Sequence, residues 1–420
     1  MARPARSART GRRPDSINLQ FSMADLKFSL TPARRARRPQ SARTACCTRR
    51  RKLAAAGGLA LFTALTLGAS AAEMERIRVS DDKRGFALED SGRKFTPWGF
   101  NYDHDERGRL IEDYWENEWQ KVVDDFGEMR ELGANVVRIH LQLGRVMKTT
   151  EEPDRKTLER LAKLVALAEE TGLYLDLTGL GCYHKQDVPA WYDKLSERER
   201  WNVQARFWQA VAEVGERSPA IFCYDLMNEP VVPGGDRQAG DWLGPPFAGK
   251  HFVQFIGLSQ QDRPRPEIAR RWIKQLAGAI RKRDTNHLVT VGLVDWSLDR
   301  PGLTSGFVPS QIEADLDFLC VHLYPKRGKI DEALKTLEGF CVGKPVVIEE
   351  TFPLHAPIDE FEKFIDESSR FSAGWIGFYW GKTIEECKRS GTIGDAITRD
   401  WLELFVRKLS WVKGLSEPSR

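Results

Sequence analysis

The sequence lacks the cysteine spacings that are typical of a metal site. It contains seven cysteines but no CxxC pair and no Cys/His spacing of a metal-binding motif. Two of them, Cys46 and Cys47, lie near the start of the chain, and five lie in its body. Because Cys223 and Cys320 lie inside apolar, strand-like runs, we expect buried thiols rather than a disulfide framework. With no triad of metal ligands and no phosphate-binding loop visible, we expect neither a metal nor another cofactor.

The body of the chain also lacks an excess of basic residues. The formal net charge of +4 hides an uneven distribution, because residues 1–72 carry 15 Lys or Arg against 2 Asp or Glu. The remaining 348 residues carry 49 basic and 58 acidic side chains. A nucleic-acid partner would require a basic surface, so the acidic body argues against one.

No apolar run is long enough for a typical membrane span. A basic stretch, residues 49–52, precedes an apolar run over residues 53–68, and Ala69-Ser70-Ala71 follows. This run is shorter than the roughly 20 residues that a spanning helix needs. The pattern predicts a signal peptide over 53–72, a secreted or periplasmic protein and no membrane insertion after cleavage; an uncleaved anchor is the alternative.

Two further features belong to this N-terminal part. Residues 1–52 are rich in Arg and have no apolar period, which indicates a disordered leader or a start codon placed too far upstream. Thr48-Arg49-Arg50 loosely matches a twin-arginine signal.

From residue 73 onward, short apolar strands alternate with amphipathic helical segments. A small hairpin is expected from short strands at 77–79, 85–88 and 93–95, closing the bottom of a barrel. Main strands are expected at 97–102, 135–141, 173–178, 221–228, 288–294, 318–324, 345–350 and 375–380. Helical segments are expected at 118–132, 154–172, 196–214, 268–281, 332–337, 358–371 and 401–409. Eight such alternations predict a (β/α)8 TIM barrel that forms a single domain over residues 73–420.

The C-terminal ends of these eight strands are unusually polar. In a TIM barrel the functional residues lie at these ends, and a purely structural barrel would not need polar side chains there. The candidates are Asn101, Asp103, Arg138, His140, Thr178, Asn228, Glu229, Asp295, Trp296, His322, Tyr324, Glu349, Glu350 and Trp380.

Two carboxylates among them suggest a specific chemistry. Glu229 closes the fourth strand and Glu350 the seventh, so their side chains can face each other across the barrel mouth. Glycoside hydrolysis needs such a pair, one protonated to assist the leaving oxygen and one ionised to attack the sugar carbon. A separation of roughly 5 Å would retain the sugar's configuration.

The chain resembles glycoside hydrolase family 5, the cellulase-like family of (β/α)8 glycosidases. The matching segments are Val137-Arg138-Ile139-His140, Leu226-Met227-Asn228-Glu229-Pro230, Val321-His322-Leu323-Tyr324-Pro325, Lys344-Pro345-Val346-Val347-Ile348-Glu349-Glu350 and Gly377-Phe378-Tyr379-Trp380. The resemblance implies that Glu229 is the acid/base and Glu350 the nucleophile. It also implies that Asn228 binds the sugar 2-hydroxyl, that Arg138 and Tyr324 hold the nucleophile ionised, that His322 flanks the acid/base, and that Trp380 floors the subsite of the attacked sugar.

Glu349 competes with Glu350 for the nucleophile's position. Neighbouring residues of a strand face opposite ways, so if Ile348 faces the barrel interior, Glu350 does too and Glu349 points toward the helices. The family pattern also places an aromatic residue shortly after the nucleophile, and Phe352 fits Glu350 better. We therefore favour Glu350.

Some features depart from the family pattern. The third strand ends in Thr178-Gly179 instead of a His, and His184 in the following loop is the nearest one. Thr351-Phe352-Pro353 replaces the usual aromatic-Gly after the nucleophile. Both departures bear on the identity of the sugar and leave the two glutamates unaffected.

The loop over residues 231–267 is long for a compact domain and rich in aromatics, so it either walls the cleft or packs on the barrel rim. We expect Asn101 to contact substrate and Trp296 to offer a second sugar platform. His140 and His184 are expected to form hydrogen bonds in the cleft rather than bind a metal.

The sequence thus predicts an exported retaining glycoside hydrolase that cleaves a β-linked glycan or glycoside of mannan or glucan type. The alternative is a non-catalytic carbohydrate-binding barrel.

Overall fold

The computed structural model describes residues 74–416. The predicted Arg-rich leader, residues 1–52, and the predicted signal peptide, residues 53–72, lie outside this part of the chain. Between residues 74 and 416, no helix is both long and apolar enough to cross a membrane.

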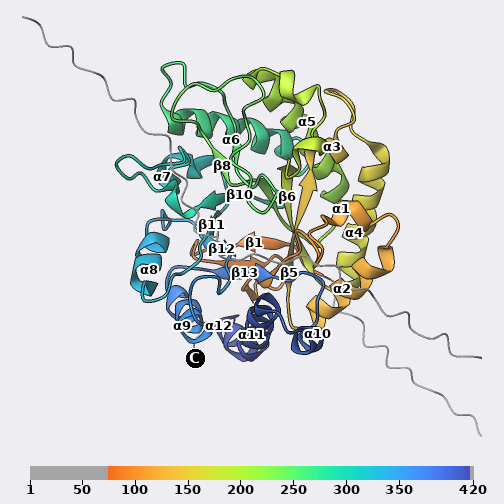
Figure 1. Cartoon of the computed structure of the whole chain (residues 1–420), viewed down its shortest axis with the longest axis vertical. Coiled ribbons are helices and arrows are strands. Elements are labelled where there is room, and N and C mark those ends of the chain that lie inside the picture. Colours follow the sequence, from red (N-terminus) through yellow and green to blue (C-terminus); the bar gives the residue numbers. More distant parts are fainter. Residues whose placement is uncertain (1–73, 417–420) are drawn as a thin grey trace, which may run out of the picture. The chain divides into compact units, whose positions relative to one another are not determined.

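Eight parallel strands form a closed barrel (Figure 1). In barrel order they are β4 (Trp98–Asn101), β5 (Val136–Gln142), β6 (Tyr174–Gly181), β7 (Ile221–Asn228), β10 (Leu288–Val294), β11 (Leu319–His322), β12 (Val346–Glu350) and β13 (Gly374–Phe378). The last strand pairs with the first, since Trp375 lies opposite Trp98. The predicted (β/α)8 fold and its eight strands are confirmed.

Helices surround the barrel and follow its strands. The main ones are α2 (Trp119–Glu131), α4 (Arg155–Thr171), α5 (Glu197–Gly215), α6 (Arg265–Arg281), α8 (Ile330–Glu338), α9 (Ile358–Ser368) and α11 (Ile393–Arg407). Helix α4 shows how the sequence sets these bounds. The Asp154 side chain accepts a hydrogen bond from the Thr157 amide at 2.8 Å and caps its start. Gly172 ends it in the left-handed conformation, at φ 68°.

Several short elements escaped the sequence-based assignment. They are α1 (Ile111–Tyr114), α3 (Leu143–Val146), η1 (Lys185–Asp187), η2 (Tyr192–Lys194), η3 (Asp295–Ser297), α7 (Pro309–Ile312), η4 (Glu313–Asp315), α10 (Ile384–Arg389) and α12 (Leu409–Ser416). Most have only one turn, which is too short for a hydrophobic period to be visible in the sequence.

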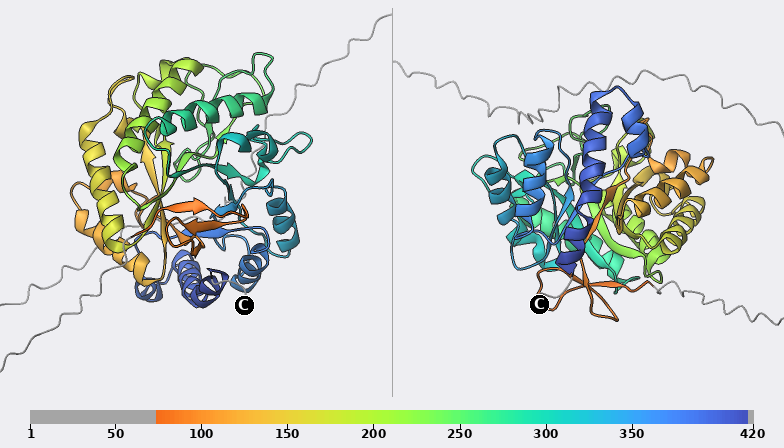
Figure 2. Two further views of the ribbon diagram at one scale, coloured as in Figure 1. Left: turned by 180° about the vertical axis from the view of Figure 1, so that it is seen from behind. Right: turned by 90° about the horizontal axis from the view of Figure 1, so that it is seen from below.

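A small antiparallel sheet closes the end of the barrel where the strands begin. It consists of β1 (Ile77–Val79), β2 (Phe86–Leu88) and β3 (Lys94–Phe95), one strand more than a simple hairpin (Figure 2). The Phe86 ring packs edge-on against Phe222 and Phe318, at 5.1 Å between centroids in both cases. These rings plug the barrel floor, so the polar strand ends at the opposite face remain for function.

The cysteines of the described residues are all free thiols. Cys182, Cys223, Cys320 and Cys387 are buried, and Cys341 is exposed. The expectation of buried thiols at Cys223 and Cys320 is confirmed.

The long loop after β7 is more ordered than its sequence indicated. Its first residues, in β8 (Pro230–Val231), pair in parallel with β9 (Gln254–Phe255) farther along the loop. Trp242 is buried, packs edge-on against Tyr192 at 4.9 Å, and donates a hydrogen bond to Asp193 Oδ1 at 2.8 Å. The loop therefore packs on the barrel rim, which is one of the two alternatives considered from the sequence.

Candidate active site

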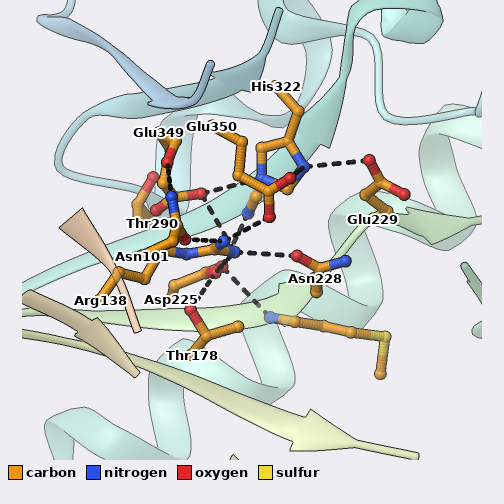
Figure 3. A network of polar contacts seen from close by, with 12 residues as sticks. Asn101, Arg138, Thr178, Asp225, Asn228, Glu229, Thr290, His322, Glu349 and Glu350 are labelled. Carbon is orange, nitrogen blue, oxygen red and sulfur yellow. Dashed lines mark hydrogen bonds and ion pairs between the residues drawn. The ribbon is translucent and has the colours of Figure 1, made fainter. Parts of the chain in front are cut away.

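The centre of the polar strand ends is the guanidinium of Arg138, which β5 carries into the barrel and which is fully buried (Figure 3). Its Nη1 donates to Glu350 Oε1 at 2.6 Å and to Asn101 Oδ1 at 2.9 Å. Its Nη2 donates to Asp225 Oδ2 at 2.8 Å and to Asn228 Oδ1 at 3.0 Å. One planar, permanently charged group thus fixes side chains from three other strands.

Asn101 and Asn228 differ in how many of their hydrogen-bonding groups remain available to a ligand. Asn101 is fully buried, and its Nδ2 donates to the carbonyls of Glu349 at 2.8 Å and Gly377 at 3.0 Å. All of its hydrogen-bonding groups are therefore engaged within the protein. Asn228 accepts from Arg138, and its Nδ2 donates to the Phe252 carbonyl at 3.2 Å, which leaves one amide hydrogen for a ligand.

Glu350, the last residue of β12, is held by further donors. The Tyr324 hydroxyl donates to Glu350 Oε2 at 2.8 Å, and His322 Nδ1 lies 3.4 Å from the same oxygen. Burial raises the pKa of the Glu350 carboxyl, although His322 and Arg138 oppose this shift. Its surroundings thus offer hydrogen bonds to the ionised form.

Glu229 follows β7 and lies opposite Glu350. Its backbone adopts a positive φ of 48°, which is uncommon for a residue with a side chain. Its amide donates to the Gly292 carbonyl at 3.0 Å, and its Oε1 lies 3.0 Å from His322 Nδ1. Oxygens of Glu229 and Glu350 lie within 4.8 Å of each other. This short separation is of the kind found between carboxylates in retaining glycosidases, at about 5–5.5 Å.

His322 connects the two glutamates to a third. Its Nδ1 faces Glu229, and its Nε2 lies 3.3 Å from Glu349 Oε2. Burial opposes a charge on the imidazole, but the charge of Glu350 and the contacts to Glu229 and Glu349 outweigh it and raise the pKa of His322 to about 10. His322 is therefore a cation at neutral pH.

The predicted orientation of Glu349 is wrong. It is fully buried inside the barrel, where its Oε2 lies 3.5 Å from Arg138 Nη2. Ile348 packs in the layer shared with the helices, and Val347 packs inside the barrel, so the alternation runs opposite to the one assumed. A register shift between β11 and β12 precedes Glu350. Glu350 is thus the partly exposed residue of the pair, and Glu349 lies below it.

Glu349 differs from Glu350 in the direction in which its pKa is shifted. Burial would raise the pKa of the Glu349 carboxyl, but Arg138 and His322 outweigh that effect and lower it to about 2. Glu349 is therefore an anion that faces both cations, Arg138 and His322.

Two carboxylates of this network were missed in the sequence. Asp225 on β7 accepts from Thr178 Oγ1 at 2.8 Å and from the Gly292 amide at 2.7 Å. Asp176 on β6 is 0% exposed, and its carboxyl faces that of Glu349, with no other hydrogen-bond partner in the described part of the chain. Burial and the charge of Glu349 raise the pKa of Asp176 well above its ordinary value, so this carboxyl keeps its proton. The signal available in the sequence was a single acidic residue inside each apolar strand, Leu175-Asp176-Leu177 and Tyr224-Asp225-Leu226.

Gly292 on β10 makes room for this network. A methyl group at its Cα would lie 2.9 Å from both Glu349 Oε2 and His322 Nε2, and 3.1 Å from Arg138 Nη2. These approaches are shorter than ordinary van der Waals contacts, so only glycine fits without displacing the charged groups.

Two groups of side chains have donor atoms close enough to hold a metal ion, namely Glu229 with His322 and Glu350, and Asp176 with Asp225 and Glu349. In the second group, Arg138 already supplies positive charge, at 2.8 Å from Asp225 and 3.5 Å from Glu349. In the first, the protonated imidazole of His322 lies between the carboxylates. Each group thus already contains or contacts a cation of the chain itself.

The two tryptophans expected to bind sugar lie in different surroundings. Trp380, just after β13, is half-buried and stacks on Phe378 at 5.3 Å and 22°, while Phe352 packs edge-on against it at 5.1 Å. Trp296, in η3, is also half-buried and packs against Val231, Val253 and Phe255 of the long loop. Trp380 is therefore supported by aromatic residues next to Glu350, and Trp296 by the loop.

Two histidines were expected to form hydrogen bonds, His140 at the end of β5 and His184 in the loop after β6. His140 is buried, and its Nδ1 is hydrogen-bonded to the Tyr183 hydroxyl. Burial lowers the pKa of His140 well below its ordinary value, so it is neutral. His184 is half-buried at the start of η1. For His140, the expected hydrogen-bonding role is confirmed.

Comparison with known proteins agrees with this geometry. Residues 90–376, more than half of the chain, match the family Cellulase (glycosyl hydrolase family 5). Aligned over 221 residues, the chain is 26% identical to mannan endo-1,4-beta-mannosidase A of Podospora anserina. The alignment covers 46% of this chain and 50% of that protein.

Solved structures share the fold. An exo-beta-1,4-mannosidase from Opitutaceae bacterium strain TAV5 superposes with a TM-score of 0.59 at 17% identity, over 80% of this chain and 62% of that one. A beta-1,4-mannanase from the sea hare Aplysia kurodai gives 0.55 at 15% identity, over 79% and 96%. On the family match, the chain belongs to glycosyl hydrolase family 5.

Proposed function

We propose that this protein is a retaining glycoside hydrolase that cleaves a β-linked glycan, with Glu229 as acid/base and Glu350 as nucleophile. One observation carries the proposal: these carboxylates come from β7 and β12, and their oxygens lie within 4.8 Å of each other at the mouth of the barrel. This separation leaves room for one sugar carbon and its leaving oxygen, but not for an additional water molecule.

The reaction has two steps. In the first, Glu350 attacks the anomeric carbon while the bond to the leaving oxygen breaks and Glu229 gives that oxygen its proton. In the second, Glu229 takes a proton from water, whose oxygen attacks the same carbon and releases Glu350. The hydrogen bonds from Arg138 and Tyr324 hold Glu350 ionised and aimed before attack.

Neighbouring residues support these roles. Because Arg138 binds the oxygen of the Asn228 amide, the nitrogen must point away, and its free hydrogen is available to the sugar 2-hydroxyl. Protonated His322 donates to Glu229 when that carboxylate is ionised, which stabilises it between the two steps. Trp380 supplies the flat face against which the attacked sugar packs.

For the substrate we propose a β-linked glycan of mannan or glucan type. The fungal relative named as a mannan endo-1,4-beta-mannosidase favours mannose, although this chain spans about half of its length. We further propose that the protein acts after export, through the signal peptide expected over residues 53–72, and that no nucleic acid is a partner.

A non-catalytic sugar-binding barrel is the other candidate function. Binding alone would not require two carboxylates facing one reaction centre, nor a cation between them. We therefore favour the enzyme.

Hydrolysis of aryl β-glycosides and soluble β-mannans and β-glucans tests this proposal. We expect wild type to cleave a β-substrate and both Glu229→Ala and Glu350→Ala to lose several orders of magnitude in rate. Azide should restore turnover to Glu350→Ala and give an α-glycosyl azide. The control is Glu332→Ala, which removes an exposed carboxylate of α8. A folded wild type that binds these glycans but cleaves none would contradict the enzyme assignment.

A further inference from the structure

A lysine of the long loop, Lys250, lies near the barrel mouth and is mostly buried. Lys250 is only 8% exposed, and its Nζ forms no hydrogen bond or ion pair within residues 74–416, although the ammonium itself keeps contact with solvent. Burial lowers the pKa of Lys250, while Asp103 and Asp105 oppose this shift. Lys250 thus carries a positive charge that no carboxylate of the described residues pairs directly.

The backbone around Lys250 is built to hold it there. Phe247 and Lys250 exchange two backbone hydrogen bonds of 2.8 Å each around a two-residue turn. The turn residues, Ala248 and Gly249, have positive φ values of 47° and 81°, as such a tight hairpin requires. The hairpin exposes its turn and buries its lysine.

This hairpin, residues 247–250, reaches across part of the barrel mouth. A methyl group at Gly108, in the loop after β4, would lie 3.4 Å from Lys250 Nζ. The His251 amide donates to the Tyr183 carbonyl at 2.8 Å, in the loop after β6. Since β5 and β6 lie between β4 and β7 in the barrel, the contact between the loops after β4 and β7 crosses above both strands. The loops after β4 and β7 therefore meet above this part of the mouth.

Acidic and aromatic side chains border the lysine at the edge of the site. Asp103 is buried, its Oδ2 lies 2.8 Å from His104 Nδ1, and its Oδ1 has no hydrogen-bond partner among the described residues. The His104 ring lies 6.0 Å from that of Trp380. An unpaired carboxylate oxygen of Asp103 therefore lies near the surface assigned to the attacked sugar, and the Lys250 ammonium interacts electrostatically with Asp103.

We propose that Lys250 and Asp103 bind hydroxyl groups of a non-reducing terminal sugar, and that the protein therefore removes sugars from chain ends. A sugar hydroxyl can donate to the carboxylate and accept from the ammonium, so a neutral chain end satisfies both groups. A longer glycan would have to pass where the loops after β4 and β7 meet. This inference rests on the proposed function, and it adds the mode of attack and the residues that impose it.

The first test compares β-1,4-mannohexaose labelled at its reducing end with the same oligomer carrying a 4-O-methyl group on its terminal sugar. Wild type should shorten the free oligomer one sugar at a time and cleave the blocked oligomer at least about a hundredfold more slowly, since the blocked hydroxyl cannot be accommodated. Early release of labelled products of mixed length, or equal rates on both oligomers, would overturn the proposal.

The second test assigns the effect to the two residues. Lys250→Met and Asp103→Asn should each lower kcat/KM on an aryl β-mannoside by about ten- to a hundredfold, mainly through KM, because each removes a hydrogen bond to a charged group. Lys274→Met, which changes an exposed lysine of α6, is the control. Circular dichroism checks that the variants are folded. The idea is overturned if folded Lys250→Met and Asp103→Asn have the same kcat/KM on the aryl β-mannoside as Lys274→Met.

A binding measurement separates this inference from the proposed function. In calorimetry with the Glu350→Gln protein, mannobiose should bind and its 4-O-methyl derivative should bind at least about tenfold more weakly. If wild type cleaves no glycoside but this preference is present, the proposed function fails and the assignment of the two residues stands. If wild type cleaves glycosides without such a preference, only the inference about chain ends fails.

Discussion

The imidazole of His322 lies 3.0 Å from the carboxylate of Glu229, on the side facing Glu350. Because the pKa of His322 is raised to about 10 in the folded protein, from about 6.5 in an unfolded chain, folding retains a proton over this range. The stabilisation from this proton is fully present below pH 6.5 and is lost as the pH rises through 10.

We therefore expect the free energy of unfolding of wild type to fall with pH between 7 and 10 more steeply than that of His322→Gln. The difference in slope should approach about 1.4 kcal/mol per pH unit. Urea titrations at several pH values measure it, with His184→Gln as the control. Parallel slopes for wild type and His322→Gln would show that His322 is not protonated in the folded protein.

Asp176 and Asp225 should respond differently to the same substitution. Asp225→Asn removes a charge in direct contact with Arg138 and should cost about 3–5 kcal/mol of stability. Asp176→Asn imitates a carboxyl that is already neutral. The raised pKa of Asp176 makes the wild type lose stability as the pH rises above about 4. At pH 7 the free energy of unfolding of Asp176→Asn should therefore equal or exceed that of wild type. Thermal unfolding of both variants at pH 5 and pH 8 is the measurement, and an equally destabilised pair would refute a neutral Asp176.

Glu349 and Glu350 can be distinguished chemically. Glu349→Ala leaves Arg138 and His322 with one carboxylate fewer, so we expect a loss of stability of about 3 kcal/mol together with a lower kcat. Azide should not restore its turnover, because the vacated space lies below the sugar. Rescue of Glu349→Ala by azide, with product of inverted configuration, would reverse the assignment of the nucleophile.

Substitutions at Trp380 and Trp296 can be compared to locate the attacked sugar. Trp380→Ala should raise KM for an aryl β-glycoside by about tenfold or more, because its ring is braced by Phe352 and Phe378 as a flat surface for the sugar. Trp296→Ala should change KM for the same small substrate by less, since Trp296 packs against the long loop. Steady-state kinetics on short and long substrates measures both, and a larger effect at Trp296 would place the attacked sugar on the loop side.

The barrel was predictable because each strand is a short apolar run followed by a helical period, and the strand ends carry polar side chains where this fold requires them. Seven of the proposed site residues, Asn101, Arg138, Asn228, Glu229, His322, Tyr324 and Glu350, accordingly lie in one network of contacts. Trp380 and Trp296 lie outside this set of polar contacts.

The orientation of Glu349 was not predictable from the strand itself. Val346, Val347 and Ile348 are all apolar, because both faces of a barrel strand are buried, so the sequence does not show which of them faces inward. The burial of Asp176 and Lys250 was missed for a similar reason. Burial of a charged side chain depends on elements far apart in the sequence, such as the loops after β4 and β7.

The glycine at position 292 carries a consequence for directed evolution. It contacts no sugar in the scheme above, yet any larger side chain there would press on Arg138, His322 and Glu349 together. In a saturation mutagenesis screen for activity, position 292 should therefore be as intolerant as the two glutamates that we propose to be catalytic. Libraries that aim to alter sugar preference should leave it fixed and diversify the rim of the barrel instead.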